Sequence, residues 1–450
     1  MSCSTSESSQ HPARALMAAV SPPAAAGDRS PPRRGRIAWL LLDCGASAYS
    51  TIAITLMVAY VERVVFADKP WGVPGGVVWA WTLGVAMLVS AVLSPLAAGW
   101  ADRYAAHRRA LAASVLGGSL ACIMLGLVPA TAPVAVVSMV GLAAVGFDLA
   151  AIFTGALLPA IAEGPDADRL SAGGFAAGYA GGAIALLAAA GLVAESESLG
   201  LDQPTALRAA FALTGCWWLG FSLPAMLGRI PPLPPAAGGA GGSIRELSRF
   251  IGSLSSGDVR LRSLARFLAG AVLVLGAVQT TIGQVSSVAI EEFDLDAQAL
   301  VRLVLIVQAV ALPGAILIGW LSVHRSRRTA LAICLAGWTL VLAAAWFIAS
   351  RWQLEALAVL LAVVLGGVQA VIRAVVAVLA PKTHAGAAFG GLQVGSKLAG
   401  FVASIGFGGI YWLTDRPRAG VAVLLVQLLL GWMILAGVRI DEEQTLTPPD

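Results

Sequence analysis

Residues 37–61 read IAWLLLDCGASAYSTIAITLMVAYV, with Asp43 as their single charged side chain. A helix of about 20 mostly apolar residues spans the hydrocarbon core of a bilayer, so this stretch is predicted to cross a membrane. Eleven similar runs follow it, at residues 77–100, 110–129, 134–161, 171–194, 206–229, 265–290, 299–322, 329–349, 354–380, 388–412 and 419–438. The chain is therefore predicted to be an all-α membrane protein with twelve transmembrane helices.

The composition favours the same fold class. Hydrophobic residues make up 58% of the 450 positions and charged residues 12%, with a mean hydropathy of +0.83. A soluble domain is roughly a quarter charged, so the composition excludes a soluble enzyme, a secreted disulfide scaffold and a disordered protein. The five Cys lack CxxC or metal-ligand spacing, and no P-loop, GxSxG or HExxH motif occurs. We expect no enzymatic activity, no cofactor or metal, and no binding of nucleic acid.

A long polar segment separates two groups of six spans. It opens with the breaker run Arg229-Ile-Pro-Pro-Leu-Pro-Pro, and apolar residues then recur at helical spacing at positions 244, 247, 251 and 254. This spacing is typical of an amphipathic helix on a membrane surface. The predicted organisation is a disordered cytoplasmic tail (1–35), an N-terminal six-helix half (36–229), a cytoplasmic linker with an amphipathic helix (230–264), a C-terminal six-helix half (265–438) and a cytoplasmic tail (439–450).

The basic residues predict the orientation. With the N-terminus in the cytoplasm, 20 of the 29 lysines and arginines lie on the cytoplasmic side, seven lie outside and two lie within spans. Loops rich in lysine and arginine favour the cytoplasm. We therefore expect a multi-pass protein of a bacterial inner membrane, with both termini cytoplasmic, surrounded by bilayer lipid and acting as a monomer.

A weak repeat relates the two groups of spans. Gly99-Trp100 ends the second span and Gly319-Trp320 ends the eighth, and Gly, Trp, Arg, Ala and Leu coincide at an offset of 220 residues. Two six-helix halves related by duplication are a common transporter architecture.

The turn after the second span resembles the loop motif of the major facilitator superfamily, which has a Gly, an Asp-Arg pair and two basic residues. Here the motif runs from Gly99 to Arg109, without its usual second Gly. An acid such as Asp102 is favoured at a helix N-terminus, where unpaired N–H groups attract negative charge. The resemblance implies a gating role for Asp102, Arg103 and Arg109.

A closer resemblance is to one branch of that superfamily, the vacuole-effluxer-like transporters, which include autophagy-linked amino-acid exporters and bacterial relatives. Four stretches carry it: Trp39, Asp43, Ser47, Ala48 and Tyr49; Leu158, Pro159, Ser171, Gly174, Gly178, Tyr179, Gly181 and Gly182; Phe267, Leu268, Ala269, Gln279 and Thr280; and Gly367, Val368, Gln369, Ala370, Arg373, Pro381, Phe389, Gly390 and Lys397. The chain departs from the branch at Ala46 and Gly155, which replace Asn, and at Leu275-Gly276, which replaces an Asn-Asp pair. The resemblance implies that the first, fourth, seventh and tenth helices line a central cavity.

Four charged side chains lie inside apolar spans: Asp43, Asp148, Arg373 and Lys397. Each costs roughly 2.5–3.5 kcal/mol or more at the bilayer centre unless it is paired or hydrated. The acids belong to the N-terminal half and the bases to the C-terminal half, so a zwitterion such as an amino acid could bridge them. One of the acids could also carry a coupling proton. In the alternative interpretation the four residues form salt bridges between the halves and hold one transport state closed.

Neutral polar side chains within the spans are further candidates for binding a solute or proton, although buried amides more often join helices. They are Tyr49, Tyr179, Gln279, Gln369 and Gln393, with Gln308 beside them in the eighth span.

Two other patterns predict structural roles. Gly174, Gly178 and Gly182 form a stripe of small residues, expected to pack against a partner helix such as the eighth near Ala309 and Gly314. The acids that follow the seventh span are expected to form a solvated outer loop: Glu291, Glu292, Asp294 and Asp296.

These patterns predict a secondary transporter that works by alternating access. The resemblance implies proton-coupled efflux of amino acids or similar small zwitterions, with a small solute and a proton as partners. One alternative is an exporter of hydrophobic drugs or secondary metabolites, which the missing acid in the seventh span favours. The other is a membrane receptor or scaffold that does not transport.

Overall fold

The computed structural model describes residues 33–162, 165–233, 244–254, 258–381 and 384–438. These residues contain twelve helices long and apolar enough to cross a membrane, which confirms the predicted fold class. The first span joins α2 (Arg33–Ile52), the π-helical η1 (Ala53–Met57), α3 (Val58–Tyr60) and the π-helical η2 (Val61–Val65). The other eleven are α4 (Gly75–Arg103), α5 (His107–Leu127), α6 (Pro133–Ala156), α7 (Pro165–Ala194), α8 (Gln203–Pro224), α10 (Val259–Phe293), α11 (Ala297–His324), α12 (Arg327–Ala344), α13 (Arg351–Leu379), α14 (Ala385–Thr414) and α15 (Pro417–Ala436).

Several helices continue beyond the apolar runs that predict them. α10 begins at Val259 and not at residue 265, and the first span ends at Val65 and not at residue 61. Hydropathy marks only the part of a helix that sits in hydrocarbon, whereas backbone hydrogen bonds carry the helix into the polar region. Most of the predicted N-terminal tail (1–32), the C-terminal tail (439–450) and the glycine run 238–242 lie outside the described residues.

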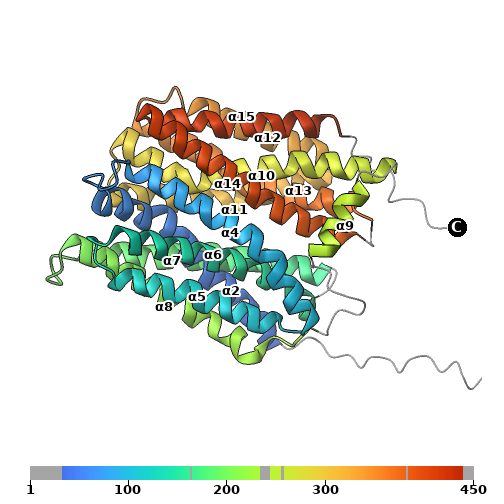
Figure 1. Cartoon of the computed structure of the whole chain (residues 1–450), viewed down its shortest axis with the longest axis horizontal. Coiled ribbons are helices and arrows are strands. Elements are labelled where there is room, and N and C mark those ends of the chain that lie inside the picture. Colours follow the sequence, from blue (N-terminus) through green and yellow to red (C-terminus); the bar gives the residue numbers. More distant parts are fainter. Residues whose placement is uncertain (1–32, 163–164, 234–243, 255–257, 382–383, 439–450) are drawn as a thin grey trace, which may run out of the picture.

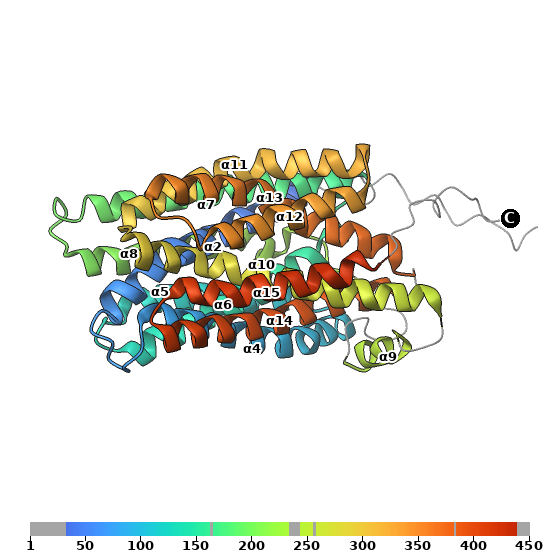
Figure 2. The same cartoon turned by 90° about the horizontal axis from the view of Figure 1, so that it is seen from above.

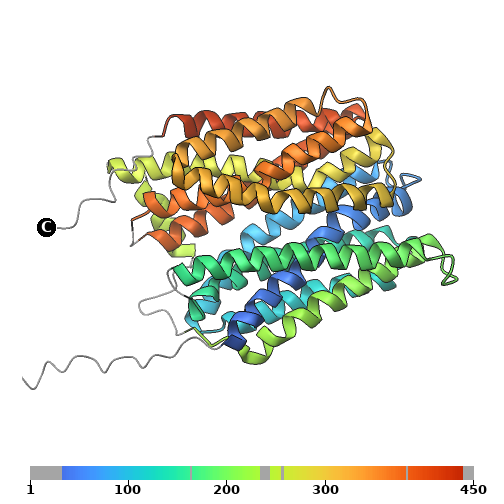
Figure 3. The same ribbon diagram turned by 180° about the vertical axis from the view of Figure 1, so that it is seen from behind.

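The helices form two bundles that lie side by side (Figure 1). α5, α6, α7 and α8 pack with the first span in the N-terminal half, and α10 to α15 pack together in the C-terminal half. The view from behind shows the same division (Figure 3). The helices α4 and α14 form the largest contact between the halves, and α7 and α11 also meet there.

The spans end at two faces of the molecule. We call the face where the first span begins and α15 ends the terminal face, and the opposite face, which carries Phe66, Phe293 and Asp415, the distal face. The short helix α9 (Ile244–Leu254) lies within the predicted linker (230–264), where the amphipathic helix was predicted, and is at the terminal face (Figure 2). Its Phe250 is buried, with the ring 5.9 Å from that of His384.

The glycine stripe of α7 packs against the first span. The α-carbons of Gly174, Gly178 and Gly182 face the side chains of Asp43, Ser47 and Thr51, which recur on α2 with the same spacing of four residues. Two stripes with equal spacing interlock along their length, which is why the partner is α2. The predicted contact with the eighth span is confirmed at one end of the stripe, where Gly182 lies near Gln308 of α11, but Gly314 packs against Val363 of α13.

Candidate functional site

The interface between the two halves, called the seam below, is sealed by apolar packing at the distal face. The core of the N-terminal half continues across the seam into the C-terminal half. The residues that extend it are Ile290 and Phe293 of α10, Leu300 and Val304 of α11, and Leu354 of α13, all of them buried. This packing closes the distal part of the seam to water.

Several polar contacts cross the seam at the same face or at mid-depth. Near the distal face, Arg63 donates to Asp294 (2.5 Å) and to the carbonyl of Ile290 (3.3 Å), Trp79 donates to the carbonyl of Gly283 (2.8 Å), and Lys69 lies 3.6 Å from Asp415. At mid-depth, Lys397 donates to Asp148 at 2.6 Å. The structure thus holds the halves together on the distal side.

The ion pair of Asp148 and Lys397 is the central feature of the candidate site. At 1.5 Å per residue, Asp148 lies about 22 Å from the first residue of α6 at the distal face, and Lys397 about 18 Å from the first residue of α14 at the terminal face. Their side chains are 13% and 20% exposed. The pair therefore joins the two halves near the middle of the membrane with little water around it.

The other two charges predicted from the sequence do not join this pair. Asp43 is half-buried against Gly174 of α7, and Arg373 is exposed on the terminal half of α13. Neither side chain makes an ion pair or a hydrogen bond with a described residue. The structure therefore combines one acid and one base of the predicted four, and leaves one unpaired charge on each half.

The neutral candidates occupy different surroundings. Tyr49 is buried in the aromatic core of the N-terminal half, with its ring 5.3 Å from Phe147 and 5.4 Å from Trp218. Gln279 has a buried carbonyl oxygen without a hydrogen-bond partner among the described residues. Tyr179 and Gln369 are half-buried, and Gln393 is exposed. Their roles in binding a solute stay predictions.

The turn between α4 and α5 places Asp102 beside the start of α5. Its carboxylate lies 2.8 Å from Nε2 of His107, the first residue of that helix. Arg103 lies over the ring of Tyr104, 5.4 Å from its centroid, and Arg109 is exposed. The turn closes through Ala105, which has a φ of 50°.

The structure adds a buried acid, Glu62, that the apolar pattern does not indicate. A span that ends at residue 61 places this acid in a loop, whereas the helix continues to Val65 and Glu62 is only 5% exposed. The apolar residues on both sides of the Glu62-Arg63 pair are the signal that could have extended the span.

The predicted solvated outer loop is partly engaged in specific contacts. Glu292 lies 2.7 Å from Arg418, and Asp296 caps α11 by accepting from the backbone N–H of Ala299. Asp294 is exposed and binds Arg63. The hydrogen bond and the charge of Arg63 hold the pKa of Asp294 below its usual value. Glu291 is exposed as predicted, but Glu291 and Glu292 belong to the last turn of α10 and not to a loop.

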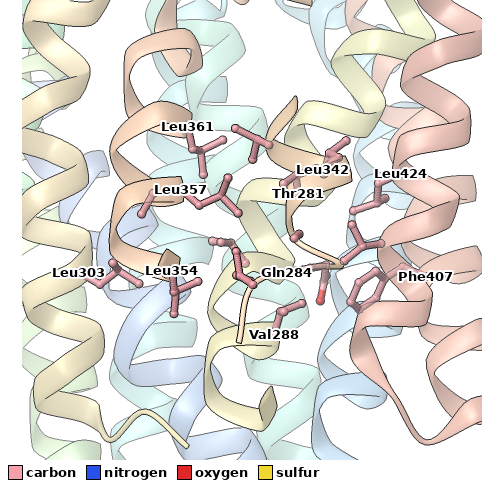
Figure 4. A pocket seen from close by; sticks show the side chains of 16 residues that line it. Thr281, Gln284, Val288, Leu303, Leu342, Leu354, Leu357, Leu361, Phe407 and Leu424 are labelled. Atoms are coloured by element: carbon pink, nitrogen blue, oxygen red, sulfur yellow. The ribbon is translucent and has the colours of Figure 1, made fainter. Parts of the chain in front are cut away.

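An apolar cavity lies inside the C-terminal half, and Leu354, which extends the core across the seam, is among the residues that line it (Figure 4). Its walls come mainly from leucine and valine side chains, and Thr281 and Gln284 of α10 are its two polar lining residues. Both amide atoms of Gln284 are buried without a partner among the described residues. The cavity is thus separate from the Asp148–Lys397 pair.

Comparisons with known proteins agree with this architecture. The family described as vacuole effluxer Atg22 like matches residues 77–445. The chain is 24% identical over 403 residues to an uncharacterised MFS-type transporter of Bacillus subtilis (strain 168), YxiO, and the match covers 89% of this chain and 94% of that protein.

Solved structures share the fold. The human organic anion transporter MFSD10 has a TM-score of 0.62 at 15% identity, with 90% of this chain and 100% of that chain covered. The xylose transporter XylE of E. coli, in an inward-open conformation, has a TM-score of 0.63 at 13% identity, with 91% and 98% covered.

Proposed function

The chain belongs to the family described as vacuole effluxer Atg22 like, and on this premise we propose that it is a secondary transporter that exports amino acids or similar zwitterions, coupled to protons, by alternating access. In this mechanism two six-helix halves rock about a central site, which faces one side of the membrane at a time. The excess of arginine at the terminal face supports a cytoplasmic location for that face and for both termini.

The observation that carries the proposal is the ion pair between Asp148 and Lys397. A zwitterion presents an ammonium and a carboxylate, the same two charges that form this pair. The ammonium of a bound amino acid would replace Lys397 at Asp148, and its carboxylate would replace Asp148 at Lys397. Substrate binding would then exchange one set of charge contacts for another, without leaving a charge unpaired at mid-depth.

The two unpaired charges complete the proposal. Arg373, exposed on α13, offers a fork of N–H donors for a carboxylate that approaches from the terminal face. Asp43, half-buried without a counter-charge, offers a carboxylate for the coupling proton. The closed distal part of the seam means that both groups would meet solute and protons from the terminal face in this conformation.

Transport in proteoliposomes tests the proposal. We expect Asp148→Asn and Lys397→Gln to reduce counterflow of a labelled neutral amino acid more than tenfold, a loss of about 1.4 kcal/mol or more. The matched control Asp68→Asn removes an exposed acid at the distal face and is expected to keep wild-type flux. Wild-type flux in both seam variants, with normal insertion, would exclude these two residues from the site.

The apolar cavity of the C-terminal half favours a second candidate, the export of hydrophobic compounds. Competition separates the two candidates. Amino acids inhibit the flux of a labelled substrate in the first case, whereas only hydrophobic compounds inhibit it in the second.

A further inference from the structure

Glu62 is an acid in the sealed part of the seam that forms no ion pair with a described residue. It belongs to the π-helical segment η2 at the distal end of the first span and is 5% exposed. Both carboxylate oxygens are buried, and neither has a hydrogen-bond partner among the described residues. No part of the proposed transport site uses this residue.

Three further helices converge on this carboxyl group. Gly75 and Gly76 of α4 bring their backbone against it, so closely that a Cβ at Gly76 would lie 3.0 Å from Oε1 of Glu62 and 2.9 Å from the ring of Tyr411 on α14. Ser287 of α10 lies at the same point, and its buried hydroxyl is the polar neighbour of the carboxyl group from that helix. Because α10 and α14 belong to the other half, Glu62 lies where the two halves meet.

The charged groups around Glu62 do not neutralise it. Arg63, its neighbour on the same segment, donates to Asp294 and to a backbone carbonyl. From α10, the exposed Glu291 is a second acid nearby, and from α14 the ring of Tyr411 packs against the same glycine, Gly76, with Asp415 at the end of that helix. The helix α4 brings Gly75 and Gly76 to this contact. An ionised carboxylate buried in this way costs several kcal/mol, whereas the neutral acid does not.

We infer that Glu62 is a proton-binding site of the distal gate: the seam closes around the protonated acid, and the acid ionises when the seam opens. The O–H bond forms with a proton taken from water at the distal face as the halves close, and the proton returns there when water reaches the carboxyl group. This inference rests on the alternating access proposed above, in which the distal seam opens once in each cycle.

The consequence is a gate that responds to pH at the distal face. If closure binds one proton, the ratio of closed to open seam changes by up to about tenfold for each pH unit. A low pH holds the gate closed, and a high pH favours the open form. The gate responds to pH in this direction because the acid is neutral, and so holds a proton, when the seam is closed.

A cysteine reporter in the seam tests this linkage. Ala289 of α10 is fully buried in the core that crosses the seam, so Ala289→Cys reacts with a water-soluble maleimide only when the seam opens. The full-length protein is labelled in nanodiscs between about pH 5.5 and about pH 8.5. Each rate is divided by the rate of the same chain denatured in SDS, which corrects for thiol ionisation, and the signal of the parent without the reporter is subtracted.

We expect the corrected rate to rise with pH by up to about tenfold per unit in the reporter protein. Glu62→Gln, a neutral isostere, is expected to give a low rate that changes less than about twofold over the range. Glu62→Asp keeps a carboxyl group and is expected to keep a pH dependence. The control Glu291→Gln removes the neighbouring exposed acid and is expected to leave the pH dependence in place. Elution profile and thermal unfolding verify that each variant folds.

A pH dependence that survives Glu62→Gln, or a flat profile in the unsubstituted reporter protein, would overturn the inference. The result of this gate test can be distinguished from the result of the transport test of the proposed function. A Glu62-dependent gate in a protein that moves no amino acid supports this site and removes the substrate proposal. Amino-acid flux with a gate independent of Glu62 does the reverse.

Discussion

Removal of one partner of the Asp148–Lys397 pair should destabilise the folded protein measurably. At the 2.6 Å between Lys397 Nζ and Asp148 Oδ1, and an effective dielectric constant of about 20, the Coulomb attraction is about 6 kcal/mol. Loss of one partner of a buried pair costs about 3–5 kcal/mol because the other charge is left uncompensated. Both side chains keep some exposure, so we expect about 3 kcal/mol for Lys397→Met. We expect about 1–2 kcal/mol for Asp148→Asn, because the flexible lysine stem can carry its charge towards water.

The free energy of unfolding in mixed micelles, followed by tryptophan fluorescence, measures these changes. The double variant D148N/K397M leaves no charge behind, so it should recover about 2 kcal/mol relative to the sum of the single variants. Arg373→Met is the matched control, because Arg373 is exposed and unpaired, and a change within about 0.5 kcal/mol is expected. The reasoning fails if Lys397→Met matches this control, or if the double variant is no more stable than the sum of the single changes predicts.

Three further predictions concern the turn, the distal gate and helix packing. Ala105→Gly should raise the free energy of unfolding by up to about 1 kcal/mol, since glycine adopts the positive φ of this turn without strain. An unchanged or lower free energy of unfolding would contradict this prediction. Asp294 has a lowered pKa, so its contact with Arg63 is fully formed above the ordinary range of aspartate and is lost as pH falls through that lowered pKa. Spin labels on the distal ends of the first span and α10 should therefore show local loosening of this contact in the wild type only in stronger acid than an ordinary aspartate would require, and at every pH in Asp294→Ala. Gly181→Ala would place a Cβ 2.6 Å from the carbonyl oxygen of Cys44. We expect it to lower the free energy of unfolding by about 1–3 kcal/mol, measured by thermal or denaturant unfolding. An unchanged free energy of unfolding would show that the first span and α7 separate easily.

The apolar pattern was sufficient to predict the twelve spans, because burial in hydrocarbon is a local requirement that each helix meets with its own residues. It was less informative at helix ends. The pattern did not indicate that Glu62 is buried, because an acid next to an arginine is typical of a polar loop. In the structure both residues lie in a continuous helix.

The sequence was sufficient to predict which residues belong to the candidate site, but not which of them contact one another. Asp148 and Lys397 were recognised because a charge inside an apolar run is costly anywhere along the chain. Their pairing joins positions 249 residues apart and depends on how the halves close, which no local pattern encodes. The same applies to the stripe at Gly174, whose partner on α2 is set by the packing of two helices.

The two π-helical segments of the first span each add an extra residue to a turn of that helix. A π turn holds one residue more than an α turn, so a return of η1 to α geometry would turn everything beyond Met57 by about 100° about the helix axis. Such a rotation could swing Glu62 out from among its neighbours while the helix stays intact. The extra residue of the π turn thus allows the distal end of this span to rotate about the helix axis without breaking the helix.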